Sequence, residues 1–215
     1  MPDKTRRMTL TIAILLAIIA LSAGVFVAQH MYVKKKLDAS QLNGTLLDEA
    51  RAVQPFSLTG IDHKPFDNAS LHGSWTMVFF GFTNCGYMCP TTMAELGKTY
   101  RLLEQQGVKT LPNIVMISVD PARDSLEKLG HYVKAFDPHF YGARGSQTAI
   151  KGMTRELGIA YLNVARNDTD DASNYDIEHT GSVMLFNPQG ALVAFFTSPL
   201  QAASLAKDYT LLIAG

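Results

Sequence analysis

The order of strand-like and helix-like segments is the feature that most limits the fold of this chain. Residues 76–82, "TMVFFGF", are apolar and aromatic and are bounded by turn residues, which is typical of a strand. Residues 90–106 carry apolar side chains at helical spacing between a proline and a glycine, which favours a helix. A buried strand at 113–119 and a helix from Asp124 repeat the pattern. This alternation predicts a layered α/β domain.

The C-terminal part of the chain continues the same pattern. A short helix is expected at 147–157. Two strands, at 182–186 and 191–196, are separated by the turn sequence "NPQG", which predicts a hairpin. A helix at 202–213 is expected to close the domain.

The N-terminal region contains an uncharged run at residues 8–28. A helix of this length covers about 30 Å, enough to cross a bilayer. We expect one transmembrane helix here, with residues 1–7 as a cytoplasmic tail and the rest exported; removal as a signal peptide is the alternative. Residues 29–52 are polar without a clear period and are expected to form a tether, which leaves 53–215 as the globular domain.

Composition and flanking sequence narrow the location and the partners. The span is not preceded by a presequence rich in Arg and Ser, so we expect a bacterial inner membrane with the domain in the periplasm. Removing the first 36 residues leaves 13 basic against 18 acidic residues, and this mild acidity argues against nucleic acid as a partner. Five of the acids lie within 168–178. A solvated loop is the first interpretation of that cluster, and a docking surface is the second.

The chain has only two cysteines, Cys85 and Cys89. With 215 residues, 47% of them hydrophobic, it can bury a core without disulfides. Two cysteines are too few for a disulfide framework or for a four-cysteine zinc or iron–sulfur site. They therefore indicate a redox pair, or part of a metal site that another residue type completes.

The predicted elements place both thiols at one end of a strand. Cys85 lies in the loop that leaves the strand, and Cys89 lies at the start of the next helix, where unpaired N–H groups favour thiolates. Residues at this spacing in one helical turn are about 6 Å apart, within the range that a disulfide tolerates. The pair can close to a disulfide or bind one soft metal ion.

Three separated motifs resemble the Sco/SenC family of copper chaperones. They are "GFTNCGYMCP" around the cysteines, "SVDPARDS" at 118–125 and "YDIEHTGSVMLFNPQG" at 175–190. Members of that family are membrane-anchored thioredoxin-fold proteins that assist assembly of cytochrome c oxidase, and the resemblance extends from Phe56 to the C-terminus. It implies a thioredoxin-like fold with an added hairpin, in which a loop at 160–176 carries His179 towards the cysteines.

The same resemblance implies a site and a cargo. The family's ligand pattern falls on Cys85, Cys89 and His179, which would bind one copper ion per chain, as Cu(I) or Cu(II), and deliver it to the CuA site of a copper-accepting oxidase subunit. A second periplasmic copper carrier or a thiol reductase is expected as a further partner. Gly86 and Tyr87 depart from the proline and acidic residue that many members have, which affects redox potential, metal release and the partner surface.

Two functions of different class are compatible with these residues. A metallochaperone is favoured over an enzyme, and it requires His179. The alternative is a thiol-disulfide oxidoreductase that reduces the cysteines of an oxidase subunit or another exported protein, with Cys85 and Cys89 as its catalytic redox pair. A peroxidase is weaker, because such enzymes set the attacking cysteine in a different motif.

Several neighbouring residues have simpler interpretations. Met93 belongs to the apolar stripe of its helix and Met88 can pack nearby, so neither is favoured as a ligand. Asp120 is expected to end a strand near the site, whereas Asp124 with Glu127 is typical of a capping box. Surface or core roles are expected for the other histidines: His30, His63, His72, His131 and His139.

Overall fold

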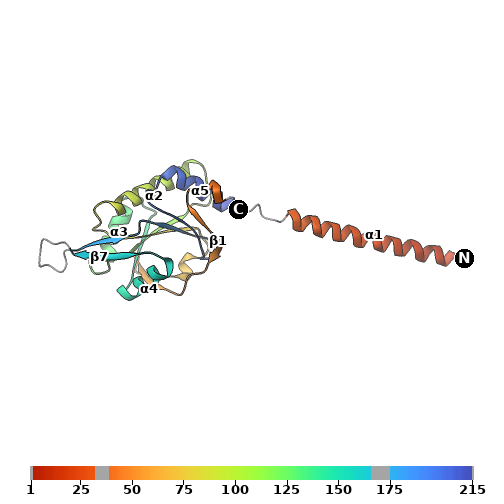
Figure 1. Ribbon diagram of the computed structural model, residues 1–215, viewed down its shortest axis with the longest axis horizontal. Helices are drawn as coiled ribbons and strands as arrows, with labels where there is room; N and C mark the ends of the chain where they lie inside the picture. The colour runs from red at the N-terminus through yellow and green to blue at the C-terminus, as the bar shows by residue number, and fades with distance from the viewer. Residues whose placement is uncertain (1, 32–38, 166–174, 215) are drawn as a thin grey trace. The chain divides into compact units, whose positions relative to one another are not determined.

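The computed structural model describes residues 2–31, 39–165 and 175–214 (Figure 1). It divides the chain into two compact units at the boundary between Asp38 and Ala39. The smaller unit contains the helix α1 (Pro2–Met31), which includes the expected transmembrane segment. Within the part of the chain that the structure describes, no helix meets the length and hydropathy needed to cross a membrane.

The larger unit is built on an eight-stranded mixed sheet with the strand order β1-β10-β9-β4-β5-β6-β2-β3. Only the pairs β4–β5 and β5–β6 are parallel. The strands of this sheet are β1 (Thr45–Arg51), β2 (Ser57–Gly60), β3 (Pro65–Asp67), β4 (Thr76–Gly81), β5 (Asn113–Ser118), β6 (Tyr141–Arg144), β9 (Val183–Phe186) and β10 (Leu192–Phe196). Short 3₁₀ turns, η1 (Ala39–Gln41) and η2 (Asn68–Leu71), complete the strand-rich edges.

The central strand β4 sits between β9 and β5, and all six of its residues are buried. It runs parallel to β5 in a register that pairs Thr76 with Asn113 and Gly81 with Ser118. A strand enclosed on both faces reads as a continuous apolar run, which is why "TMVFFGF" predicts it well. Because the carboxyl ends of β4 and β5 are adjacent, the segments that follow them meet at one edge of the sheet.

The helices follow the expected pattern. They are α2 (Met88–Gln105), α3 (Leu126–Lys134), α4 (Gln147–Leu157) and α5 (Ala202–Ala214), and α2 and α5 pack side by side (Figure 1). The expected capping box at Asp124 is wrong. Ser125 caps α3, accepting a hydrogen bond from the Lys128 N–H at 3.1 Å. Asp124 is buried and accepts hydrogen bonds from Thr83, in the loop after β4, and from Ser118, at the end of β5.

The expected tether at residues 29–52 contains an element of the domain. Thr45–Arg51 form β1, which pairs antiparallel with β10. The strand lacks a clean alternation of buried and exposed side chains, so its sequence resembles a linker; it is held through backbone pairing at the sheet edge. Asp208, buried on α5, also fixes its start by accepting hydrogen bonds from the Asn43 and Gly44 N–H groups at 2.7 and 2.9 Å.

A second, two-stranded sheet replaces part of the expected loop at 160–176. The strands β7 (Tyr161–Ala165) and β8 (Tyr175–His179) pair antiparallel, with Tyr161 opposite His179. We call this element the β7–β8 ribbon; Figure 1 shows it projecting beside the main sheet. Of the five clustered acids, Asp176 and Glu178 lie on β8. The other three fall outside the described residues: Asp168, Asp170 and Asp171.

Candidate metal centre

The structure brings together the three residues that the sequence singles out as ligands. The Sγ atoms of Cys85 and Cys89 and one ring nitrogen of His179 all lie within 4.8 Å of one another. The Sγ of Cys89 is 3.2 Å from Nε2 of His179. Among the described residues, this is the only group of three His, Cys, Asp or Glu side chains close enough to share a metal ion.

The cysteine loop, residues 82–89, follows directly from β4 and ends in the first turn of α2. Its first turn closes when the Cys85 N–H donates to the Phe82 carbonyl at 3.4 Å. The Cys89 N–H, one of the unpaired donors of the helix N-terminus, donates to the Cys85 Sγ at 3.3 Å. Both thiols are free, with Cys85 half-buried and Cys89 fully buried.

The two thiols have opposite electrostatic environments. A hydrogen bond from Cys89, with smaller contributions from His179 and backbone N–H groups, lowers the pKa of Cys85 from 9.0 to about 4. The paired hydrogen bond and burial away from water raise the pKa of Cys89. In the metal-free reduced protein, Cys85 therefore carries the negative charge and Cys89 keeps its proton.

Asp124 holds the start of the cysteine loop in place. Its buried carboxylate accepts hydrogen bonds from the Thr83 N–H at 3.1 Å, from the Thr83 hydroxyl and from the Ser118 hydroxyl at 2.7 Å. Lys128 reaches the same loop by donating to Asn84 Oδ1 at 2.9 Å. The sequence analysis missed this role of Asp124. Its spacing to Glu127 fits a local helix cap, whereas its contact with Thr83 joins segments far apart in the chain and leaves no local pattern.

His179 is oriented by its neighbours before any ion binds. Its ring lies 5.8 Å from the rings of both Phe79 and Phe82, centroid to centroid. Nδ1 is 3.3 Å from the Thr180 carbonyl, which can only accept a hydrogen bond. When Nδ1 carries the proton and donates to this carbonyl, Nε2 is the ring nitrogen that faces the cysteines and is free to act as a metal ligand.

The remaining sequence candidates lie outside this group. Met93 is buried in the core, and Met88 packs against Gly181, where an added Cβ would meet its sulfur at 2.6 Å. His139 lies against Asp137 and stacks on Tyr100. The three residues therefore offer two sulfurs and one imidazole nitrogen to a single ion, a donor set that soft metals prefer.

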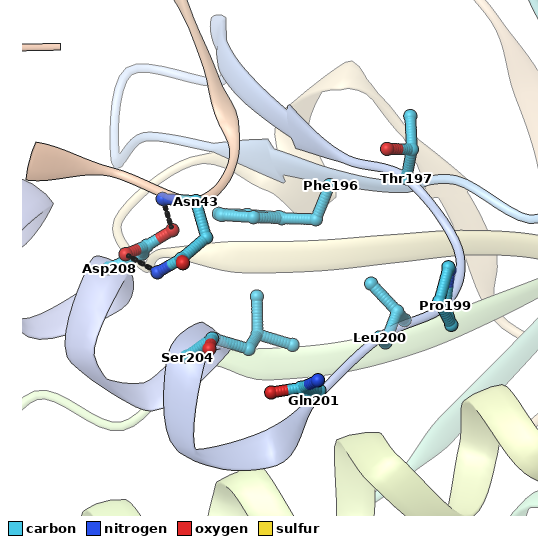
Figure 2. A pocket seen from close by; sticks show the side chains of 9 residues that line it. Asn43, Phe196, Thr197, Pro199, Leu200, Gln201, Ser204 and Asp208 are labelled. Carbon is cyan, nitrogen blue, oxygen red and sulfur yellow. Dashed lines mark hydrogen bonds between the residues drawn. The ribbon is translucent and has the colours of Figure 1, made fainter. Parts of the chain in front are cut away.

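The better enclosed hollows lie away from this group. A cavity of about 200 Å³ lies between β10 and α5, next to the Asn43–Asp208 hydrogen bonds (Figure 2). None of its lining residues belongs to the metal group. His179 instead lines a shallow depression with Leu162 and Glu178 on the ribbon.

Comparisons with known proteins agree with this geometry. A sequence profile of the SCO1/SenC family matches residues 44–214. A SCO2-like protein of Rickettsia prowazekii is 30% identical over 194 residues, which cover 90% of this chain and 92% of the relative.

Two similar solved structures are copper-bound ScoI proteins. The Arabidopsis thaliana protein is 29% identical with a TM-score of 0.69, covering 76% of this chain and 99% of that one. The Bradyrhizobium japonicum protein is 30% identical with a TM-score of 0.64, covering 74% and 98%. These likenesses confirm the expected α/β, thioredoxin-like fold. The chain belongs to the SCO1/SenC family.

Proposed function

We propose that this protein is a membrane-anchored copper carrier that delivers copper to the CuA site of cytochrome c oxidase. The observation that carries the proposal is the convergence of Cys85, Cys89 and His179 within 4.8 Å. The ScoI relatives with the same fold have been solved with copper bound. Thiolate and imidazole ligands together suit both oxidation states of copper.

The residues of the site fit one copper ion per chain. The two sulfurs provide a soft pair for Cu(I), and the His179 nitrogen adds a ligand that also holds Cu(II). Zinc fits less well, because closed zinc sites use four protein ligands and the described residues supply three. Cys85 is already a thiolate and needs no deprotonation, whereas Cys89 must release its proton when the ion enters.

Delivery requires the site to be reachable by an acceptor. Cys85 is only half-buried, and the ring of Tyr87 beside it is 80% exposed. An acceptor can therefore approach the ion from the cysteine-loop side, exchanging its own ligands for those of the carrier. The partners we propose are a copper-accepting oxidase subunit and, upstream, a periplasmic copper carrier or a thiol reductase.

We also propose that residues 8–28 anchor the protein in a bacterial inner membrane, with the domain in the periplasm. The basis is the uncharged run itself and a thiol pair suited to an oxidising compartment. C-terminal fusions to reporters that work on only one side of the membrane test the topology. Activity of a cytoplasm-only reporter would refute it.

The copper site is tested by titrating the reduced full-length protein in detergent with Cu(I) and Cu(II). We expect one ion per chain and a thiolate-to-Cu(II) charge-transfer band. His179→Ala should weaken Cu(II) binding about 10- to 100-fold and alter that band, while leaving the disulfide between Cys85 and Cys89 able to form. His139→Ala, which changes a histidine remote from the site, is the control. An unaltered Cu(II) affinity and spectrum in His179→Ala would remove this residue from the site.

The second candidate is a thiol-disulfide oxidoreductase, and the asymmetry of the two thiols favours it. A half-buried thiolate beside a buried, protonated partner is the arrangement that attacks an external disulfide and then resolves the mixed disulfide. Reduction of an oxidised peptide with paired cysteines by the protein tests this function. It should survive His179→Ala if it is the main activity, whereas copper delivery should not.

A further inference from the structure

The β7–β8 ribbon depends on side-chain contacts for its position. It shares no ladder with the eight-stranded sheet, and a two-stranded sheet alone is marginally stable in water. Alternate residues of β8, namely Tyr175, Ile177 and His179, point to one face. On that face Ile177 is buried and His179 reaches Cys89. The contacts of Tyr175, at the other end of β8, therefore decide how firmly the strand is seated.

Arg123 is the main partner of Tyr175. Its guanidinium carbon lies 3.7 Å from the centre of the Tyr175 ring, and Nη1 donates to the Tyr175 carbonyl at 2.7 Å. The buried carboxylate of Asp120 accepts from Arg123 Nε at 2.5 Å and from the Tyr175 hydroxyl at 2.6 Å. Charge-assisted hydrogen bonds of this kind, shielded from water, are among the stronger polar contacts in proteins.

This cluster also reaches the histidine through an aromatic ring. Phe82, the first residue of the cysteine loop, contacts the Arg123 guanidinium and the His179 ring, both at 5.8 Å from its centroid. The loop after β5 thus contacts β8 at its start and, through Phe82, at its end. Four residue steps along the strand, about 13 Å, separate Tyr175 from His179.

We propose that Arg123 and Tyr175 are positioning residues that latch the β7–β8 ribbon and so hold His179 at the cysteine pair. Asp120 orients the latch by accepting a hydrogen bond from each of them. When the latch is closed, the imidazole covers Cys89; when it is open, the ribbon carries the imidazole away and leaves a two-sulfur site. The part of this proposal that concerns copper rests on the proposed function, whereas the seating of the ribbon does not.

The metal-free full-length protein tests the latch directly by amide hydrogen exchange followed by mass spectrometry. In Arg123→Met, peptides covering β8 should exchange about tenfold faster or more, because charge-assisted bonds to Tyr175 and Asp120 are lost. Peptides covering β4 and β5 should be unchanged. Arg101→Met, the same substitution at a half-exposed arginine paired with Asp137 at 3.8 Å, is the matched control. Unchanged exchange in β8, or equal acceleration in both variants, would overturn the latch.

Tyr175→Phe separates the hydrogen bond to Asp120 from the stacking on Arg123. It keeps the aromatic face over the guanidinium, so we expect an acceleration in β8 smaller than that of Arg123→Met. The rate at which Cys89 is alkylated, measured in a Cys85→Ser background, should rise most in Arg123→Met and less in Tyr175→Phe. The reason is that the His179 imidazole shields the Cys89 sulfur while the ribbon is held in place. Equal alkylation rates with and without Arg123→Met would contradict the proposal.

Copper release provides the functional test. Arg123→Met should speed Cu(II) dissociation about tenfold and shift the charge-transfer band towards that of His179→Ala. In the His179→Ala background, Arg123→Met should have no further effect, because the latch acts through that ligand. An additive effect would show general weakening of the domain and overturn the positioning role. If His179→Ala leaves Cu(II) binding unchanged, His179 is not a ligand and the part of the proposal that concerns copper fails. The hydrogen-exchange experiment would then still test whether Arg123 and Tyr175 hold the ribbon in place.

Discussion

The cysteine loop and the β7–β8 ribbon supply the same candidate site by different physical means. The loop leaves a strand at the centre of the main sheet and ends in the first turn of α2, so its two thiols are placed by regular secondary structure. The ribbon stands outside that sheet, and its histidine is placed by the packing of one strand face. Two of the candidate ligands are therefore built into the loop between β4 and α2, and the third is docked against them.

The difference indicates that the loop and the ribbon have separate roles in holding an ion. A rigid pair retains the ion, whereas a docked third ligand can add or withdraw without unfolding the domain. The copper carrier proposed above needs this combination, because it must both bind and release its cargo. Substitution of a buried side chain in or below this loop, such as Cys89 or Asp124, should consequently lower copper binding or stability more than substitution of an exposed side chain such as Tyr87.

Loss of a core sulfur should have the largest effect. Cys89→Ser removes one of the two soft ligands, and we expect it to lose Cu(I) binding at micromolar copper, since a hydroxyl is a poor Cu(I) ligand. Competition against a colorimetric Cu(I) chelator measures this loss. His179→Ala should keep measurable Cu(I) binding in the same assay. An equal loss of Cu(I) affinity in the two variants would contradict the distinction between ligands built into the loop and a docked ligand.

The reactivity of the two thiols should differ by about 100-fold or more at pH 7 in the reduced, metal-free protein. Cys85, with its pKa lowered to about 4, stays a thiolate above that pH and loses its charge as the pH falls through about 4. Its alkylation rate should therefore be flat from pH 7 to 5 and fall below 4. Cys89, with its raised pKa, should react slowly throughout. A Cys85 rate that falls between pH 9 and 8 would contradict the assigned environment.

Removal of the buried anchor of the loop should lower stability. Asp124→Ala leaves the Thr83 and Ser118 donors without their acceptor, and we expect the free energy of unfolding to fall by about 3 kcal/mol. Urea unfolding followed by circular dichroism measures it. Glu178→Ala, at an exposed position on the outer side of β8, is the control and should change stability by less than about 0.5 kcal/mol.

The smallest effect is expected at Tyr87. Its ring is 80% exposed, so Tyr87→Ala should change copper affinity by less than about twofold. Transfer of copper to an oxidase subunit is the measurement in which this residue should matter. A large change in affinity would mean that the loop is less rigid than its contacts indicate.

Much of the core of this fold could be predicted from local pattern. The expected strands at 76–82 and 113–119 and the helices at 147–157 and 202–213 agree with β4, β5, α4 and α5 to within one residue at each end. The two strands are almost entirely buried, and the two helices carry apolar side chains at helical spacing. Their apolar residues therefore show directly which side chains face the core.

Elements held by edges and by long-range contacts could not be predicted in this way. β1, at Thr45–Arg51, is stabilised by pairing with β10, nearly 150 residues later in the chain. The strands β7 and β8 pair outside the main sheet, in a segment whose polar composition predicts a loop. Backbone pairing satisfies N–H and C=O groups whatever the side chains are, so it leaves little trace in the sequence.

The sequence by itself determined that two thiols lie at the start of a helix next to a central strand, because four residues of spacing and a helix N-terminus are local facts. The resemblance to a known family added His179 to the pair. Only the tertiary structure decided how that histidine reaches Cys89, with Nδ1 occupied by a carbonyl and Nε2 directed at the sulfur. It also decided that Asp124 supports the cysteine loop and Asp120 the ribbon. Both roles depend on which loops meet beyond the ends of β4 and β5, and that adjacency is created by packing rather than by any local pattern.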